Sequence, residues 1–239
     1  STDLTFSTYN DRWKERDPNW KPAAYQKEQD PIRGVFAYVA DGLLQPGEEA
    51  PAHQPQLLPG QVKLKNINGD DKLNEEDMVL IGRNDPKFIF GFNNNFSYKN
   101  FDLNIYMYGQ VGKIAGANSY YDAWGSYGNR IKLGQNVPVS FKDAWSSDNQ
   151  TSTRPSFIES AYGTGDLFLQ KISFLRIRNI TLGYTVPISK SICNRLRVYA
   201  DINNPCVWTN WKGQDPETDS NTNAYPNVTS FSIGVDISF

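Results

Sequence analysis

The amino-acid sequence predicts an all-β fold, namely an antiparallel transmembrane β-barrel segment of about six strands with long extracellular loops. Three observations lead to this prediction. Apolar and polar residues alternate over segments of about ten residues, the polar side of these segments consists mainly of Asn, Asp, Ser, Thr and Gly, and short links alternate with long polar ones. Strands of soluble sheets usually have roughly five or six residues, so long amphipathic strands favour lipid on one side and water on the other.

The first segments lie in the N-terminal half. LTFSTYNDRW shows the weakest alternation. KFIFGFNNNFSYKN places its aromatic residues on one face and Asn, Gly and Ser on the other. A short YKN turn then leads to FDLNIYMYG, whose apolar face holds Phe101, Leu103, Ile105 and Met107. The short turn predicts that these two segments form a hairpin.

Three further segments follow the same rule. In ITLGYTVP the apolar face holds Ile180, Leu182, Tyr184 and Val186. In RLRVYADIN it holds Leu196, Val198, Ala200 and Ile202, and in the final SFSIGVDISF it holds Phe231, Ile233, Val235, Ile237 and Phe239. Six strands in alternating directions place both chain ends on one side, which would be the periplasmic side because the long links are external in outer-membrane barrels.

Composition excludes some classes of protein. The 239-residue chain has a net charge of -2, so it lacks the basic surface typical of nucleic-acid binders. No apolar run approaches the roughly 18 residues of a membrane-spanning helix. The beginning STDLTFSTYNDRW does not resemble a signal peptide, and we therefore expect a cytosolic protein, a mature chain or a fragment. Cys193 and Cys206 would lie on the order of 40 Å apart if one strand joins them, too far for a disulfide.

The stretch NINGDDKLNEED resembles an EF-hand-type calcium loop, in which oxygen ligands come from positions 1, 3, 5, 7, 9 and 12. The candidate ligands in this order are Asn66, Asn68, Asp70, the backbone carbonyl of Lys72, Asn74 and Asp77. Asp71 occupies position 6, where glycine is usual because the backbone needs an unusual angle there. Two neutral amides predict weak, structural binding, and the alternative is a polar turn rich in Asn and Asp without an ion.

Several motifs in order resemble the C-terminal part of the SusC/RagA family of TonB-linked outer-membrane transporters. They are DPIRGVFAYVADGLLQ, LPGQVKLKNINGDDKLNEEDMVLIGRNDPKFIFGFNNNFSYKNFDLNIYMYGQVG, FLRIRNITLGYTVP, RLRVYADINNPCVWTNWKGQDPE and the terminal strand. Together they cover nearly the whole chain. Two positions depart from the family pattern: Asp71 replaces a glycine, and Pro205 stands where an apolar residue is more common.

This resemblance implies a 22-stranded barrel with an internal plug, of which residues 1–239 form the C-terminal part of the barrel. Within it, residues 63–82 would be the calcium-type extracellular loop and residues 228–239 the terminal strand. The family also implies a location in the outer membrane of a Gram-negative bacterium, contact with its lipid, and energised import of oligosaccharides or peptides. The implied partners are a SusD-like surface lipoprotein, the TonB complex through a missing N-terminal part, and the barrel-assembly machinery.

Two further groups of residues are functional candidates. The cluster SYYDAWGSYGNR offers aromatic side chains that could stack on a substrate, namely Tyr120, Tyr121, Trp124 and Tyr127. The terminal SIGVDISF fits a barrel-assembly signal, which consists of Ser232, Gly234, Ile237 and Phe239. We expect DPETDSNTN to be a solvated loop tip and His53, the only histidine, to lie on the surface.

Alternative functions are open at this point. A soluble, calcium-stabilised β-rich ligand-binding module would pack its apolar face on a second sheet. A passive outer-membrane porin would lack a plug and a TonB contact. A hydrolase is the weakest alternative, because any Ser-His-Asp triad would need His53. No catalytic constellation is recognisable, so we predict that the protein is not an enzyme.

Overall fold

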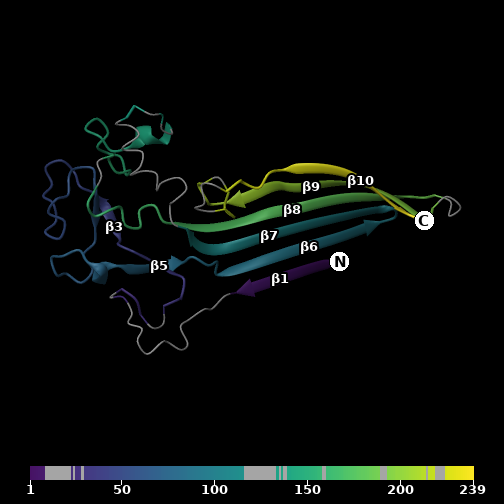
Figure 1. Ribbon diagram of the computed structural model, residues 1–239, viewed down its shortest axis with the longest axis horizontal. Helices are drawn as coiled ribbons and strands as arrows, with labels where there is room; N and C mark the ends of the chain where they lie inside the picture. Colours follow the sequence, from purple (N-terminus) through teal and green to yellow (C-terminus); the bar gives the residue numbers. More distant parts are fainter. Residues whose placement is uncertain are drawn as a thin grey trace.

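The computed structural model describes residues 1–8, 23, 25–27, 30–115, 133–134, 136, 139–157, 160–188, 193–213, 215–218 and 224–239. Its main element is a six-stranded antiparallel sheet with the order β1-β6-β7-β8-β9-β10 (Figure 1). The strands are β1 (Thr2–Thr8), β6 (Phe88–Tyr98), β7 (Phe101–Ala115), β8 (Gln170–Val186), β9 (Arg195–Thr209) and β10 (Ser230–Ser238). The predicted all-β, antiparallel fold and its six long segments are confirmed.

The two ends of the sheet differ in their connections. Both chain termini lie at the same end of the sheet, and the elements of the long connections lie beyond its other end (Figure 1). The β6–β7 turn contains only Lys99 and Asn100, with Lys99 in the left-handed conformation at a φ of 54°. Such positive φ values match the twist of two-residue hairpin turns. The direction of each strand agrees with the alternation of short and long links in the sequence.

The long connection between β1 and β6 has a fold of its own. Here β2 (Gly34–Ala37) pairs with β5 (Val79–Arg83), and β3 (Ala40–Leu43) pairs with β4 (Val62–Leu64). Leu43, Val62 and Leu64 are buried together. Two short 3-10 helices, η1 (Glu75–Asp77) and η2 (Val139–Asp143), complete the elements outside the main sheet. This connection therefore has a small core of its own, which lies at the β3–β4 ladder.

Strand β9 contains a β-bulge at the proline that departs from the family pattern. Asn179 pairs with Asn203 and Ile177 with Cys206, so Asn204 and Pro205 together oppose one residue of β8. Asn204 has a φ of 49°. A bulge tolerates proline because the ladder hydrogen bond is already interrupted there. The strand therefore continues through Pro205 to Thr209.

The two cysteines are free, as predicted. Cys193 is buried and Cys206 is half-buried within β9. Because β9 begins at Arg195 and carries Cys206 eleven positions later, an extended strand separates the two thiols.

Candidate functional site

One face of the six-stranded sheet is apolar and largely exposed. The register of the sheet aligns the apolar residues of neighbouring strands: Phe96 pairs with Leu103, Leu103 with Leu182, and Leu182 with Ala200. Directly opposed residues in a sheet point to the same side. On β10, Phe231 and Ile233 of this face are 75% and 83% exposed. A contiguous apolar surface of this extent on a monomer marks a contact with lipid or protein.

Aromatic residues lie at both ends of this apolar face. At the end near the β6–β7 turn they are Tyr98, Phe101 and Tyr184, and the Phe101 and Tyr184 rings are 4.7 Å apart. At the other end they are Phe6, Phe88, Phe90 and Trp208. The ten steps from Phe88 to Tyr98, at about 3.4 Å each and a strand tilt of about 40°, correspond to a height of about 26 Å. Membrane barrels have an apolar band of about 25 Å between two aromatic girdles.

Among the described residues, no helix reaches the length and hydrophobicity that a membrane-spanning helix needs.

The opposite face of the sheet is polar and extensively hydrogen-bonded. Asn104 on β7 donates to Asn93 and Asn95 on β6, at 2.8 and 2.7 Å. Arg197 on β9 forms ion pairs with Asp102 on β7 at 2.6 Å and with Asp236 on β10 at 3.0 Å. Its guanidinium reaches Asp102 across β8 because Gly183 has no side chain there; a Cβ at that position would collide with Arg197. This face is suited to water, unlike the apolar face.

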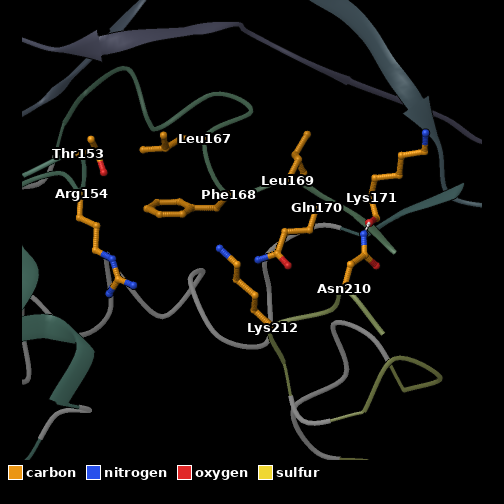
Figure 2. A pocket seen from close by; sticks show the side chains of 9 residues that line it. All are labelled: Thr153, Arg154, Leu167, Phe168, Leu169, Gln170, Lys171, Asn210 and Lys212. Carbon is orange, nitrogen blue, oxygen red and sulfur yellow. Dashed lines mark hydrogen bonds between the residues drawn. The ribbon is translucent and has the colours of Figure 1, made fainter. Parts of the chain in front are cut away.

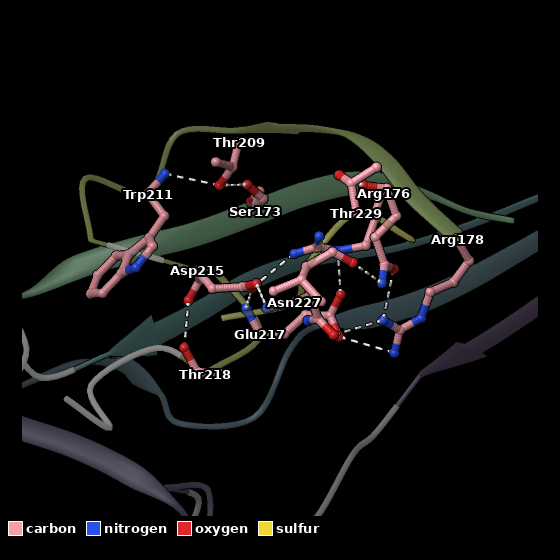
Figure 3. A network of polar contacts seen from close by, with 12 residues as sticks. Ser173, Arg176, Arg178, Thr209, Trp211, Asp215, Glu217, Thr218, Asn227 and Thr229 are labelled. Atoms are coloured by element: carbon pink, nitrogen blue, oxygen red, sulfur yellow. Dashed lines mark hydrogen bonds and ion pairs between the residues drawn. The ribbon is translucent and has the colours of Figure 1, made fainter. Parts of the chain in front are cut away.

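A buried charge cluster lies where this polar face meets the β9–β10 connection (Figure 3). Arg176 on β8, only 3% exposed, pairs with Asp215 at 2.8 Å and with Glu217 at 2.6 Å. Glu217 also pairs with Arg178 at 3.2 Å. Asp215 in addition accepts hydrogen bonds from the backbone N–H groups of Glu217 and Asn227, at 2.9 and 2.8 Å. The cluster therefore fastens both sides of the connection to the sheet.

Trp211 at the start of the β9–β10 connection also packs against the sheet. Trp211 is buried with Ala115, Ile172 and Phe174, all on strands of the main sheet. The expectation that DPETDSNTN is a solvated loop tip is thus wrong for its first residues, because Asp215 is buried and paired. Sequence reasoning counted the acidic residues as surface charges. The signal that it missed is the presence of two arginines, Arg176 and Arg178, within the long strand β8.

Burial alone would raise the pKa of Asp215. The N–H groups of Glu217 and Asn227 and the charge of Arg176 outweigh this effect, so its pKa lies below the usual range. The carboxylate is therefore charged at neutral pH, and the cluster contains two guanidinium and two carboxylate groups.

The stretch from Asn66 to Asp77 folds around one carboxylate. Asp77, which is 0% exposed, accepts hydrogen bonds from the N–H groups of Ile67 at 2.7 Å, Asn68 at 3.4 Å and Asn74 at 3.0 Å. Burial alone would raise the pKa of Asp77. The hydrogen bonds from these N–H groups lower the pKa by more than burial raises it, so the net shift is downward. Asp77, the last residue of the predicted loop, is thus an anion whose hydrogen bonds join the start of the loop, at Ile67 and Asn68, to its end, at Asn74.

The other predicted calcium ligands lie on the exposed side of the same loop. Asn66 Oδ1 accepts from the N–H of Gly69 at 2.5 Å, Asn68 Oδ1 from Asp70 at 3.1 Å, and Asp70 Oδ1 from Lys72 at 3.0 Å. This succession turns the backbone tightly and brings the polar side chains to one loop. Asp71 at position 6 has a φ of 56°, the unusual angle that the motif requires at that position.

Asn74 has a second role that the calcium pattern does not use. Its Oδ1 accepts from the N–H of Glu76 at 2.7 Å and caps η1, while its Nδ2 donates to Asp70 at 3.3 Å. No cluster of three or more His, Cys, Asp or Glu side chains suited to a metal occurs within the described ranges. A cation at this loop would therefore depend on amide and backbone oxygens, including the carbonyl of Lys72, together with Asp70 and Asp77.

The remaining predicted residues are distributed as follows. Tyr120, Tyr121, Trp124 and Tyr127 lie outside the described residues. Ser232, Gly234 and Ile237 lie on β10, and Phe239 follows it. Gly234 lies against the ring of Tyr199 on β9, where a Cβ would collide with the ring. His53 is half-buried rather than on the surface, and its Nε2 donates to the carbonyl of Leu64 at 2.7 Å.

A cavity of about 620 Å³ lies beside the N-terminal end of β8 (Figure 2). Its walls include Arg154, Phe168, Gln170 and Lys212, together with the rim residue Asn210. No sequence motif indicated it, because its residues come from three separate segments.

The sequence resembles those of known proteins, although no family model matches it. It is 27% identical over 236 residues to TonB-dependent receptor P3 of Formosa agariphila, covering 89% of this chain and 23% of the relative. It is 26% identical over 180 residues to TonB-dependent receptor SusC of Bacteroides thetaiotaomicron, covering 72% of this chain and 17% of the relative. The chain thus spans less than a quarter of the length of these relatives.

The fold also resembles solved structures. The structure of the RagAB peptide transporter matches with a TM-score of 0.65 and 21% identity, over 86% of this chain and 23% of that one. The RagAB peptide importer in its 'open-open' state matches with a TM-score of 0.63 and 22% identity. At this level of identity the match concerns the fold. The named relatives are receptors and transporters rather than enzymes. The predicted resemblance is confirmed: this chain is similar to one segment of the TonB-dependent receptors of the SusC/RagA type.

Proposed function

We propose that the chain forms six barrel strands and the external loops of a TonB-dependent importer in the outer membrane of a Gram-negative bacterium. The observation that carries this proposal is the division of one sheet into two faces. One is an exposed apolar band between two aromatic rows, and the other is a polar network that includes the Arg197 ion pairs. Lipid outside and a wet lumen inside account for both faces.

The same observation counts against a soluble binding module. In a soluble sandwich the apolar face would be covered by a second sheet, whereas Phe231 and Ile233 are exposed. The names of the relatives favour an energised importer over a passive porin, because these proteins are called TonB-dependent receptors.

The proposed partners and cargo follow from the similar proteins. SusC and RagAB support a SusD-like surface lipoprotein as partner, and the name of the RagAB peptide transporter supports a peptide as cargo. An oligosaccharide as cargo rests on the resemblance to the SusC/RagA family. The TonB complex would engage a part of the full protein that lies outside this chain. Strand β10, with Ser232, Gly234, Ile237 and Phe239, would present the signal for the barrel-assembly machinery.

Fractionation of the native host tests the proposal. An antibody raised against residues 228–239 should detect a band several times heavier than this 239-residue chain in the outer-membrane fraction. Deletion of the TonB energy-transducing protein should abolish uptake of the cargo without changing the amount of the receptor. A band of the size of this chain in the soluble fraction would refute the proposal and favour the soluble module.

We also propose that the loop at residues 63–82 binds calcium for a structural purpose. Asn66, Asn68, Asp70, the Lys72 carbonyl and Asp77 would hold the ion, with Asn74 acting through water as position 9 often does. The left-handed Asp71 and the buried charge of Asp77 support this assignment. Calcium in the millimolar range should protect the loop of the full receptor from proteolysis, and Asp70→Asn should weaken this protection. Equal proteolysis with calcium and with a chelator would contradict it.

A further inference from the structure

The cavity beside β8 is a basic pocket, defined here by Arg154, Phe168, Gln170, Asn210 and Lys212. Its nine lining residues include three cationic side chains and no Asp or Glu. The chain as a whole has 26 acidic and 24 basic residues, so this local composition is not that of the average surface. A volume of about 620 Å³ lies in the range of ligand pockets for small molecules.

Three side chains point into the same space. Figure 2 shows the ammonium of Lys212, the amide of Gln170 and the ring of Phe168 directed toward the same space, with the Arg154 guanidinium on the other side of the ring. Lys171 also lines the pocket, but its side chain leads away from this group (Figure 2). The pocket thus combines an aromatic ring, hydrogen-bond donors and positive charge.

The walls of the pocket are held by contacts within the protein. Asn210 joins the ends of two strands, because its Oδ1 accepts from the N–H of Ser173 at 2.8 Å and its Nδ2 donates to the carbonyl of Lys171 at 2.7 Å. Lys212 directly follows the buried Trp211. Phe168 packs against the buried pair Phe141 and Ala144. The site is therefore formed before a ligand arrives, which lowers the entropic cost of binding.

Two of the polar groups that line the pocket, the Lys212 ammonium and the Gln170 amide, can bind a partner that accepts hydrogen bonds. In the part of the chain that the structure describes, neither the Lys212 ammonium nor the Gln170 amide has a hydrogen bond or ion pair. An ammonium and an amide that line one pocket suit a carboxylate or sulfate, whose charge strengthens each hydrogen bond. A flat ring such as Phe168 suits the apolar side of a sugar ring, and the Gln170 amide can serve a neighbouring hydroxyl. A free peptide carries both a carboxylate and an ammonium, and the lining offers cations for the carboxylate but no Asp or Glu for the ammonium.

We infer that the basic pocket binds an acidic sugar residue, that is, a ring with a carboxylate or sulfate group, in an oligosaccharide cargo. This inference rests on the proposed importer function and specifies its substrate class. Lys212 binds the acidic group, Phe168 packs on the ring and Gln170 binds a hydroxyl.

The test uses the purified full-length receptor that contains this chain. The probes are trigalacturonate and its methyl ester, which is neutral but has the same rings, and binding is measured by titration calorimetry. We expect trigalacturonate to bind at least tenfold more tightly than the ester. Lys212→Gln should reduce the preference for the acid over the ester by about tenfold or more, because a charge-assisted hydrogen bond is lost. The matched control Lys142→Gln changes an exposed lysine outside the pocket and should have no such effect.

The outcomes separate this inference from the proposed function. Equal binding of acid and ester, or no effect of Lys212→Gln, overturns the acidic-sugar inference even if energised uptake of another cargo is intact. Binding of a sulfated trisaccharide in place of trigalacturonate, with the same dependence on Lys212, supports it and identifies the sulfate form. Binding of a tripeptide that depends on Lys212, without binding of either acidic sugar, overturns it in favour of a peptide carboxylate. Loss of TonB-dependent uptake as a whole bears on the importer proposal only.

Discussion

Asp77 is the residue that organises the loop between β4 and β5. Its carboxylate is fully buried and accepts the N–H groups of Ile67, Asn68 and Asn74. We predict that Asp77→Asn destabilises this loop by about 1–3 kcal/mol, since the amide nitrogen that replaces one oxygen cannot accept a hydrogen bond. Hydrogen exchange of these three backbone amides in the full receptor measures the effect.

The control for this prediction is Glu75→Gln, which changes an exposed carboxylate of the same 3-10 helix. It should leave the exchange of the three amides unchanged. If Asp77→Asn also leaves them protected, the buried carboxylate does not hold the loop together.

Asp215 organises the β9–β10 connection in the way that Asp77 organises its loop. Asp215→Asn removes the charge that faces Arg176 in a buried setting. Breaking one partner of a buried ion pair costs on the order of 3 kcal/mol, because the remaining charge is left without compensation. We predict faster amide exchange at Glu217 and Asn227 in this variant. The exposed Asp148→Asn, in a different loop, should not change these amides.

The same carboxylate predicts a dependence on pH. Because the pKa of Asp215 is lower in the folded protein, its contribution to stability is complete above the unfolded value of about 3.9 and is lost as the pH falls through the folded value. The protection factor of the Asn227 amide, which is corrected for the intrinsic pH dependence of exchange, should therefore fall only below about pH 4. Asp215→Asn should abolish this acid dependence, and a fall in the protection factor between pH 5 and 8 would assign it to another group.

At the scale of elements, the bulge in β9 can be tested directly. Asn204 has a φ of 49°, a conformation that costs residues with a Cβ roughly 1 kcal/mol more than glycine. Asn204→Ala and Asn204→Gly both lose the side-chain hydrogen bonds to Arg178 and Val228. We predict that the alanine variant is less stable than the glycine variant by about 1 kcal/mol. Urea unfolding of the full receptor in lipid vesicles measures this difference, and equal stability would mean that the bulge relaxes.

The long strands could be predicted from the sequence because each has to present one face to an apolar medium and the other to water. Because of this requirement, apolar and polar residues alternate with a period of two in segments such as FDLNIYMYG. The ladders β2–β5 and β3–β4 were missed, since strands of three to five residues are too short to show a period. Bulges were missed as well, although Pro205 at the β9 bulge had been noted as a departure from the family pattern.

The candidate site was predicted where a local motif contains it. The calcium-type loop is one continuous stretch, and its positive φ at Asp71 follows from the spacing alone. The Arg176 cluster and the basic pocket each combine residues from distant segments, such as Arg176 with Asp215 or Phe168 with Lys212. No single stretch of sequence carries such a combination, so only the folded chain reveals it.

At the scale of the whole molecule, the sheet is incomplete by itself. Among the described strands, β1 and β10 each have only one neighbour, so the chain has two open edges. An open edge in lipid leaves backbone groups without partners, which costs several kcal/mol for each group. These edges have to pair with strands of the full receptor, and stability tests therefore need the full receptor.

The two faces of the sheet yield a final prediction for the assembled receptor. Leu4 on β1 is opposite Phe92, near the middle of the apolar band, whereas the adjacent Asp3 belongs to the polar face. An arginine on the lipid side near the bilayer midplane costs about 2–4 kcal/mol, and a charge on the lumen side remains in water. Leu4→Arg should therefore lower the free energy of unfolding in lipid vesicles by that amount, while Asp3→Arg should change it little. If the two variants were equally stable, the apolar face would not contact lipid, and a protein partner would have to cover it instead.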